Sequence, residues 1–490
     1  MTSHFTLVYD VSHAHRRIPV EESEWGRLGC QIEGTAAESY RTAVEAHKTA
    51  GGGAGSPPFS LASVRFTEEQ LSEEVWLNTV GTFGVGSAGY WWGRAGALLV
   101  RLSHYLPPTF LRQFWLLLYA DDGKGTAGGD RLEHPLLFHL FLLEVLGTPI
   151  KWRKVHGGIE VEWVGYWLDY RRFEMGISES RAVWVCTWLD TKIRERRVAL
   201  GELREALGRL VFVTGPLEHL RPMLGPLFAW ASAGRRHARP RLPAMLLILM
   251  EFMRDQLADS RMIGCREPAL DRGELFRLDA KAEGDEVCVG GWLCAGGLST
   301  RQAPWFSVRL NKANAPWAYA RGEPFRTIAS LELLGALLGV MLLLPLGDFG
   351  RQAGTTGLIT VGCATDNQGN SYLVDRLMTT KYPLGIILVE LCHQLALRHA
   401  ALRARWVPRD QNEEADSLTN SDFRHFSADK RIAVELEDLP FGVLHGLLAK
   451  GEAYVAELAA ARANGKQAGG PAEKRQKKIQ GLGLRETQPW

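Results

Sequence analysis

The stretch Leu116-Leu117-Leu118-Tyr119-Ala120-Asp121-Asp122-Gly123 decides how this chain is interpreted. Its apolar half is typical of a buried strand, and Gly123 permits a tight turn directly after two aspartates. Two adjacent carboxylates at a strand end repel each other, and oxygen-only ligands of this kind suit Mg²⁺. A solvated acidic turn is the plain alternative for Asp-Asp-Gly taken alone. The magnesium interpretation is favoured because further carboxylates occupy matching places along the chain.

Composition sets loose limits. A chain of 490 residues has material for about two to four domains, and 46% apolar with 23% charged residues describe an ordinary globular protein. The net charge is only +2, so a nucleic-acid surface must come from local clusters of Lys and Arg. The seven cysteines form no Cys-x-x-Cys pair, which argues against a zinc site or a disulfide framework and favours reduced thiols.

No membrane segment is expected. The N-terminus lacks a charged region followed by an apolar one, so we expect no signal peptide. The longest apolar run, Leu333 to Leu346, is too short to span a bilayer and contains two glycines and Pro345. We therefore expect a protein of the cytoplasm, the nucleus or both.

The first predicted segment, residues 1–174, alternates strands with helices. An N-cap and N3 pair, Asp130 and Glu133, is expected to open a helix that closes at Gly147. The other expected elements are a strand Phe5–Tyr9 ending on Asp10, a flexible insert Ala50–Pro58, a helix through Leu102, the strand Leu116–Tyr119, and strands Trp152–Val155 and Ile159–Leu168 joined by a His156-Gly157-Gly158 hairpin. This order predicts an α+β sheet with helices on one face.

The second predicted segment, residues 175–268, is mainly helical and rich in arginine. Leu203 to Leu210 has the helical spacing of apolar residues. Basic residues recur at Arg194, Arg196, Arg197, Arg204, Arg209, His219, Arg221, Arg235, Arg236, His237, Arg239 and Arg241. Such a segment could grip a phosphate backbone, although a solvated helical face explains most of these arginines individually.

The third predicted segment, residues 269–426, predicts a mixed five-stranded sheet with helices on both faces. The expected strands are Leu275–Lys281, Gly290–Ala295, Trp305–Leu310, Leu358–Thr365 and Leu402–Val407, and the expected helices are Ser330–Leu344, Gly369–Met378, Leu384–Ala400 and one near Asn412. The last segment, residues 427–490, is expected to hold one helix, Leu447–Ala463, and a disordered basic tail. The tail's Lys474 to Lys478 run could address the nucleus, touch nucleic acid or simply be solvated.

Seven motifs, taken in order, resemble those of a retroelement reverse transcriptase with an RNase H domain, of the tyrosine-recombinase (DIRS) type or the long-terminal-repeat type. They are Asp10 to Val20, Phe83 to Ala88, Tyr119-Ala120-Asp121-Asp122, Gly147 to Lys154, Val161 to Asp169, Gly208 to Trp230, and Trp406 to Leu418. The resemblance implies a palm, a helical thumb and connection, and an RNase H-like α/β domain with a mixed five-stranded sheet. Because the family's fingers would precede Asp10, it also implies an N-terminally truncated chain whose fingers are largely missing.

The resemblance assigns roles to particular residues. It implies that the catalytic residues are Asp10, Asp121, Asp122, Asp279, Glu332, Asp366 and Asp416, all but Asp122 as metal ligands. It further implies nucleotide or template contacts at His15, Phe83, Gly84, Tyr119 and Lys154, and a primer grip at Trp163, Gly165 and Tyr166. The implied cofactor is Mg²⁺, two ions per active site, with Mn²⁺ as a substitute, and the implied partners are an RNA template, a DNA primer, an RNA–DNA hybrid and deoxynucleoside triphosphates.

The chemistry supports two sites independently. Phosphodiester formation and cleavage both use two metal ions about 3.5 to 4 Å apart, which requires carboxylates from separate elements to converge. Asp10 and Asp121 end two predicted strands, and Asp279, Glu332, Asp366 and Asp416 come from two strands and two helix starts. Helix capping or surface charge is the alternative for Glu332 or Asp416 taken alone. Where family members often carry a histidine before the last aspartate, this chain has Arg409.

The main functional hypothesis is a retrotransposon RNA-directed DNA polymerase with RNase H activity. One alternative is a decayed or domesticated nucleic-acid-binding protein without polymerase activity. Another is a nuclease in which only the RNase H-like half works. Oligomeric state and the identity of the template stay open.

Overall fold

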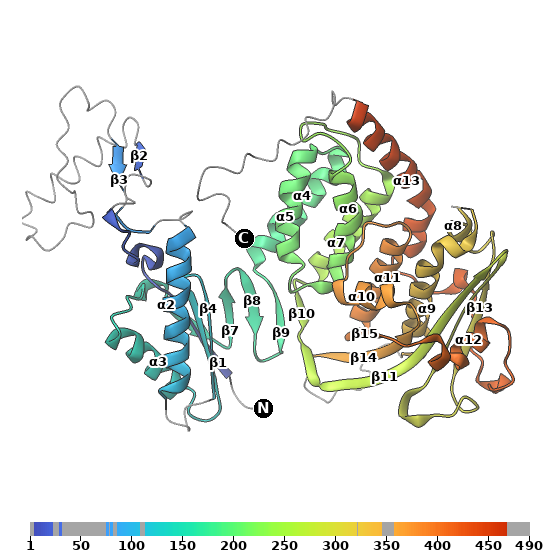
Figure 1. Ribbon diagram of the computed structural model, residues 1–490, viewed down its shortest axis with the longest axis horizontal. Coiled ribbons are helices and arrows are strands. Elements are labelled where there is room, and N and C mark those ends of the chain that lie inside the picture. Colours follow the sequence, from blue (N-terminus) through green and yellow to red (C-terminus); the bar gives the residue numbers. More distant parts are fainter. Residues whose placement is uncertain are drawn as a thin grey trace, which may run out of the picture. The chain divides into compact units, whose positions relative to one another are not determined.

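The computed structural model describes residues 4–22, 29–31, 75–77, 79–81, 86–107, 113–320, 322–344 and 357–467. Phe83, Gly84, the insert at residues 50–58 and the basic run at residues 474–478 lie outside the described residues. The chain forms two compact units, one reaching to Val164 and the other spanning Gly165 to Lys478 (Figure 1). The sequence-based division at residues 174, 268 and 426 stays a prediction.

The first unit is built on an antiparallel sheet with the strand order β4-β5-β1-β6. Its strands are β1 (His4–Asp10), β4 (Phe114–Tyr119), β5 (Asp122–Gly128) and β6 (His156–Gly158), and its further elements are the pair β2 (Gly29–Gln31) and β3 (Val75–Leu77), β7 (Glu160–Trp163), α2 (Gly86–Tyr105), α3 (Glu133–Val145) and the 3₁₀ turns η1 (Ala14–Arg17) and η5 (Trp152–Lys154). α2 contacts β4, and α3 contacts β5 and α2. Tyr9, Trp92, Phe114 and Leu143 are buried together in this core.

Two predictions for residues 152–158 are wrong. The expected strand at Trp152 is the 3₁₀ turn η5, and the expected hairpin loop is β6, which pairs with β1 through Val8 and His156. A Cβ on Gly157 would lie 2.7 Å from the Thr6 carbonyl oxygen, so glycine is what allows this strand to approach β1.

The expected capping pair at the start of α3 does not form either. The helix begins at Glu133 with Leu132 at its N-cap, and no side chain caps it, because residues before it form a turn in which His134 N–H donates to the Arg131 carbonyl. Its end agrees with the prediction, since Gly147 follows with a φ of +66°.

The second unit begins with a helical block. Its elements are the antiparallel strands β8 (Tyr166–Asp169), β9 (Glu174–Ile177) and β10 (Met262–Gly264), then α4 (Glu179–Glu195), α5 (Leu200–Val213), η6 (Glu218–Met223), α6 (Leu224–Ala231) and α7 (Ala244–Asp259). α4 packs on α7 and α5 packs on α6. The leucines of α5 at Leu203, Leu207 and Leu210 are fully buried, which confirms the predicted helical face.

A mixed five-stranded sheet fills the rest of this unit, as predicted. Its order is β13-β12-β11-β14-β15, antiparallel from β11 to β13 and parallel from β11 to β15. The strands are β11 (Arg266–Glu283), β12 (Glu286–Leu293), β13 (Trp305–Leu310), β14 (Leu358–Thr365) and β15 (Ala400–Trp406). The main helices are α9 (Ile328–Leu343), α10 (Gln368–Arg376), α11 (Leu384–Leu397), α12 (Glu413–Thr419) and α13 (Leu444–Gln467), with the short α8 (Pro316–Tyr319) and η8 (Pro324–Thr327) before α9.

Helices cover both faces of this sheet. A Cβ on Gly335 of α9 would lie 3.1 Å from Val289, whereas a Cβ on Gly290 would lie 2.9 Å from Leu418 of α12. Consecutive residues of a strand point to opposite faces, so α9 and α12 lie on opposite sides of β12. The prediction of helices on both faces is confirmed.

α9 is apolar because it is a core helix. By length and composition the segment Pro324–Leu343 could cross a membrane, but 72% of its most apolar stretch is buried inside the fold. The helix packs on β11 and β12, and a Cβ on Gly339 would lie 2.6 Å from the ring of Phe276. The helix is longer than the apolar run identified in the sequence, because it begins at Ile328 rather than at Leu333.

The C-terminal helix α13 is anchored to the core by a buried carboxylate. Glu390 of α11 is 0% exposed and accepts hydrogen bonds from the backbone N–H groups of Gly442, Val443 and Leu444 at 2.9 to 3.0 Å. The three donors lie at the N-terminal end of the helix, where backbone N–H groups have no carbonyl partner within the helix. Farther along, the Tyr454 hydroxyl donates to the Pro226 carbonyl at 2.9 Å, and α13 packs on α7 (Figure 1).

Candidate metal centres

Three carboxylates of the second unit converge, and we call them the acidic cluster: Asp279, Glu332 and Asp366. One ligand oxygen from each lies within 4.8 Å of the others. Over the described ranges this is the one group of three or more acidic, His or Cys side chains that meets this limit. The fold explains the convergence. β11 and β14 are parallel and pair Arg277 with Ala364, so that Asp279 and Asp366, each two residues farther on, come side by side.

Burial makes this cluster costly when all its members are ionised. Asp279 and Glu332 are only 3% and 4% exposed. Burial raises the pKa of Asp279 to about 6, with a contribution from the charges of Asp366 and Asp416 and a partial offset from Thr419. Burial, followed by the charges of Asp279 and Asp366, raises the pKa of Glu332 well above its usual range. A divalent cation would relieve this repulsion.

Hydroxyl groups orient two of the three carboxylates. Thr419 Oγ1 donates to Asp279 Oδ2 at 2.6 Å, and Thr365 Oγ1 donates to Glu332 Oε2 at 3.3 Å. A cavity of about 300 Å³ opens beside the cluster and is lined by all three carboxylates together with Asn367 and Arg409. The site therefore offers hard oxygen ligands, which are the donors that Mg²⁺ prefers, and it has space for a substrate.

The fourth predicted ligand, Asp416 of α12, lies nearby but outside this group of three. Its Oδ1 accepts a hydrogen bond from Arg409 at 2.7 Å, and its Oδ2 accepts one from Asn420 at 2.7 Å. Arg409 thus neutralises Asp416 in this structure. Arg409 and Lys281 are the two cationic side chains that line the cavity, and they are paired with Asp416 and Glu283.

The predicted aspartates of the first unit occupy neighbouring strands, and we call Asp10, Asp121 and Asp122 the β1–β5 site. Asp10 and Asp122 face each other in the register of β1 and β5, while Asp121 lies in the turn before β5. Two indoles hold this turn: Trp92 donates to the Ala120 carbonyl at 2.8 Å and Trp163 donates to the Asp122 carbonyl at 3.3 Å. The three carboxylates do not come together within the 4.8 Å limit that the acidic cluster meets.

Two lysines already occupy the carboxylate of Asp10. Lys151 Nζ lies 2.6 Å from Oδ1, and Lys154 Nζ lies 2.7 Å from Oδ2. Although burial opposes it, contact with these ammonium groups lowers the pKa of Asp10 below its usual range. Burial raises the pKa of Asp122, helped by the charges of Asp121 and Asp10.

The other predicted contacts of the first unit are dispersed. His15 lies in η1, where its carbonyl accepts a hydrogen bond from Ile18 N–H. Tyr119 ends β4 and is 62% exposed. Phe83 and Gly84 lie outside the described residues.

The predicted primer grip falls on the boundary between the two units, with Trp163 in the first and both Gly165 and Tyr166 in the second. Within the second unit, Tyr166 stacks on Phe212 of α5 with ring centroids 4.4 Å apart. Gly165 has a φ of +81°, and a Cβ there would lie 2.1 Å from the guanidinium of Arg181. Glycine at this position therefore leaves room for Arg181.

An arginine and aromatic face runs along α4 and α5. Arg181 lies 4.4 Å from the centre of the Phe212 ring, and Arg209 lies 4.4 Å from the Trp184 ring. These four side chains line a cavity of about 480 Å³. Other arginines of this segment are structural. Arg204, for example, donates to the carbonyls of Ala231 and Gly234.

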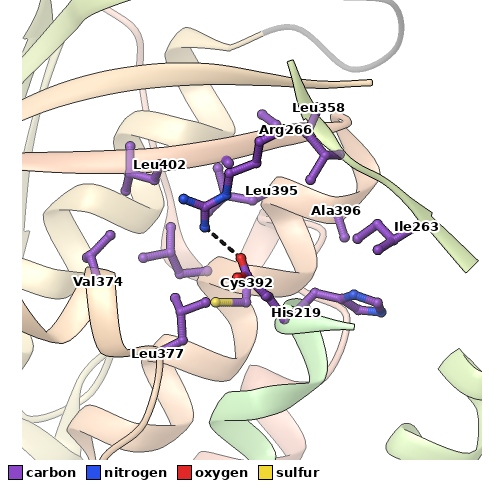
Figure 2. A pocket seen from close by; sticks show the side chains of 14 residues that line it. His219, Ile263, Arg266, Leu358, Val374, Leu377, Cys392, Leu395, Ala396 and Leu402 are labelled. Atoms are coloured by element: carbon purple, nitrogen blue, oxygen red, sulfur yellow. Dashed lines mark hydrogen bonds and ion pairs between the residues drawn. The ribbon is translucent and has the colours of Figure 1, made fainter. Parts of the chain in front are cut away.

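A third cavity, of about 50 Å³, is enclosed by apolar side chains and shares no lining residue with the acidic cluster (Figure 2). Its polar rim is the Arg266–Glu218 ion pair, 2.6 Å long, drawn as the dashed line in the figure. Burial lowers the pKa of the adjacent His219 to about 4, so this imidazole is neutral at physiological pH. The cavity has space for a few water molecules and no convergent charges.

The residues that orient the carboxylates were missed in the sequence. Lys151 precedes Lys154 by three residues, which is the spacing that aligns side chains in a 3₁₀ turn, but that turn was expected to be a strand. Thr365 directly precedes Asp366, and Thr419 follows Asp416 by three residues. A search for hydroxyl side chains next to predicted metal ligands would have found both threonines.

No protein-family model matches the chain, and no curated protein matches it. The chain is similar to a solved structure of the foamy viral protease-reverse transcriptase in complex with RNA/DNA hybrid, with 11% identity and a TM-score of 0.37 over 82% of this chain and 44% of that chain. It is also similar to the foamy viral protease-reverse transcriptase dRH in complex with double-stranded DNA, with 11% identity and a TM-score of 0.38 over 83% of this chain and 58% of that chain. The chain spans about half the length of the solved structures that it matches.

Proposed function

We propose that the protein is a retrotransposon-type enzyme that cleaves the RNA strand of RNA–DNA hybrids at the acidic cluster and extends a DNA primer on an RNA template at the β1–β5 site. The observation that carries the proposal is the convergence of Asp279, Glu332 and Asp366 within 4.8 Å beside an open cavity. Carboxylates that converge from a strand, a helix and the end of a second strand, two of them buried, are costly to hold without cations.

The residues of the acidic cluster fit divalent metal ions. Asp279, Glu332 and Asp366 supply oxygen ligands only, and the raised pKa values of Asp279 and Glu332 mark a shortage of positive charge. When bound, two Mg²⁺ ions would activate the attacking water and stabilise the leaving oxygen of the phosphodiester. Thr419 and Thr365 hold the Asp279 and Glu332 carboxylates in place, and Arg409 offers a positive charge to a phosphate in the cavity.

The polymerase assignment rests on the β1–β5 site. Asp10 and Asp122 face each other across two strands, with Asp121 in the adjoining turn. Lys154, which the family resemblance assigns to the nucleotide, is directly paired with Asp10. The substrates we propose are deoxynucleoside triphosphates, an RNA template and a DNA primer.

The nucleic-acid partner is expected to contact the α4–α5 face as well. Arg181 and Arg209 are exposed guanidinium groups backed by aromatic rings, which suits contact with phosphates and sugar edges. Such binding weakens as salt rises and does not depend on base sequence.

A hybrid-cleavage assay on the full chain tests this proposal. With Mg²⁺ or Mn²⁺ we expect cutting of the labelled RNA strand, and we expect Asp366→Asn to lower the rate at least about 100-fold, because an amide is a poor substitute for a charged ligand. Asp375→Asn on α10 is the matched control, since Asp375 is exposed and outside the cluster. Asp10→Asn should leave cutting intact and abolish primer extension.

Two results would favour the other candidates. Cutting without any primer extension would favour a nuclease in which only the acidic cluster is active. Hybrid binding without cutting, in folded protein with either metal, would overturn the enzymatic proposal in favour of a nucleic-acid-binding protein.

A further inference from the structure

The β1–β5 site contains two cations of its own, and both contact the carboxylate of Asp10. Both oxygens of Asp10 are in contact with ammonium groups, Oδ1 with Lys151 at 2.6 Å and Oδ2 with Lys154 at 2.7 Å. Asp10 itself is only 5% exposed, so few other directions of approach to its carboxylate remain. A divalent cation that binds Asp10 therefore meets an ammonium group at each carboxylate oxygen and competes with it.

The two lysines are held by local structure and are not long side chains that have met by chance. Lys151 N–H donates to the Asp10 carbonyl at 2.9 Å, and Lys154 N–H donates to the Lys151 carbonyl at 2.8 Å. The 3₁₀ turn η5 lies against β1, and its spacing of three residues places both ammonium groups on the same carboxylate. Their exposure differs, since the side chain of Lys151 is 34% exposed and that of Lys154 is 63% exposed.

We propose that Lys151 and Lys154 are built-in counter-ions of Asp10, which compete with a divalent cation for this carboxylate and which a polyphosphate anion draws away. The inference rests on the polymerase assignment above and deepens it. A nucleoside triphosphate carries the anionic groups that attract two ammonium ions, and its arrival would free Asp10 for metal. Binding of polyphosphate and binding of metal at this site are then linked, each raising the affinity for the other.

The structure limits this proposal to Asp10. Lys124, on the neighbouring strand β5, has its ammonium 5.3 Å from the centre of the Trp163 ring, whereas the lysines that contact Asp10 are Lys151 and Lys154. It is therefore a matched control for a general loss of positive charge from the same unit. Arginine at position 151 or 154 retains the charge and is the conservative replacement.

The first experiment measures Mn²⁺ affinity by electron paramagnetic resonance. It uses the full chain with Asp279→Asn and Asp366→Asn, which silence the acidic cluster. In this background Lys151→Gln and Lys154→Gln should each raise Mn²⁺ affinity roughly tenfold, within the usual range of coupling between sites. Lys124→Gln should leave the affinity unchanged, and Lys151→Arg should restore the original value.

A double-mutant cycle with Asp10→Asn makes the result specific. When Asp10 is an asparagine, the lysine substitutions should no longer change Mn²⁺ affinity, because the carboxylate for which they compete is gone. Circular dichroism checks folding, and Lys154→Gln carries the test if the less exposed Lys151 proves necessary for folding.

The second experiment measures binding of inorganic tripolyphosphate by calorimetry, with EDTA present. Asp10→Asn should bind tripolyphosphate about fivefold more tightly than the parent chain, because it releases both lysines. Asp122→Asn removes the same charge without releasing them and should have a smaller effect. Equal affinities in the two variants would overturn the proposal.

The outcomes separate this proposal from the function on which it rests. If Mn²⁺ binding depends on Asp10 but is unchanged by the lysine substitutions, the counter-ion proposal is wrong and the polymerase assignment stands. If Mn²⁺ binding does not depend on Asp10 in any variant, both are wrong.

Discussion

The two carboxylate sites of this chain solve the same electrostatic problem in opposite ways. In the acidic cluster, Asp279, Glu332 and Asp366 are packed together, and burial pushes the pKa of the first two upward. In the β1–β5 site, Asp10 is as deeply buried, yet two lysines lower its pKa. Burial of a carboxylate thus says little about its charge until its neighbours are known. The cluster is left short of cations, whereas the β1–β5 site has its own.

The largest expected effect is on stability, and its sign differs between the sites. The pKa of Asp279 is raised from 3.8 to about 6, so the folded chain binds a proton more tightly and loses stability as pH rises from about 4 to 6. Without metal, Asp279→Asn should therefore stabilise the second unit at pH 7 by about 3 kcal/mol. Hydrogen exchange of peptides from this unit, read by mass spectrometry, measures the change.

The first unit should show the opposite behaviour. The pKa of Asp10 is lowered, so the ionised carboxylate stabilises the folded unit at pH values above the ordinary aspartate pKa. This stabilisation is lost as pH falls through the lowered value. Asp10→Asn should destabilise this unit at pH 7, as seen by faster exchange in peptides of β1. The comparison breaks down if Asp10→Asn and Asp279→Asn shift exchange in the same direction.

A smaller effect is expected at Asp416, and it sharpens the definition of the acidic cluster. Because Arg409 and Asn420 already hold its carboxylate, Asp416→Asn should lower hybrid cleavage only about tenfold, a cost of roughly 1.4 kcal/mol in the barrier. Cleavage rates of Asp416→Asn and Asp366→Asn, measured side by side, provide the check. Equal losses would make Asp416 a full member of the site and Arg409 its displaceable partner.

The smallest effect is expected on the α4–α5 face. Arg209→Gln should weaken hybrid binding uniformly across sequences and reduce the salt slope of log affinity by about 1, since it removes one phosphate contact. Arg204→Gln is the contrasting variant, because Arg204 binds backbone carbonyls and its loss should lower stability instead. Filter binding at several salt concentrations distinguishes the two. A sequence-selective loss for Arg209→Gln would contradict the proposed contact.

The sequence was informative where burial alone determines structure. The strand Leu358–Thr365 has the bounds that its apolar run predicts, and with the order of strands this was enough to expect the five-stranded sheet and to place Asp366 at a strand end. It was uninformative where two segments meet. The sequence of β6 resembles that of a loop, because its glycines are there to let the strand approach β1. The contact between Lys151 and Asp10 could not be predicted, because it depends on the 3₁₀ turn η5. Arg181 likewise depends on the space left by Gly165.

The anchoring of α13 by Glu390 has a consequence for how the chain folds as it is synthesised. The carboxylate of α11 emerges from the ribosome 52 to 54 residues before the backbone amides that it binds. Until Gly442 to Leu444 follow, the Glu390 carboxylate lacks these three backbone donors, while Gln394 on the same helix can already donate to it. The nascent five-stranded sheet can form earlier, but burial of α11 must wait for α13, so this unit is completed only after Gly442 to Leu444 have been synthesised.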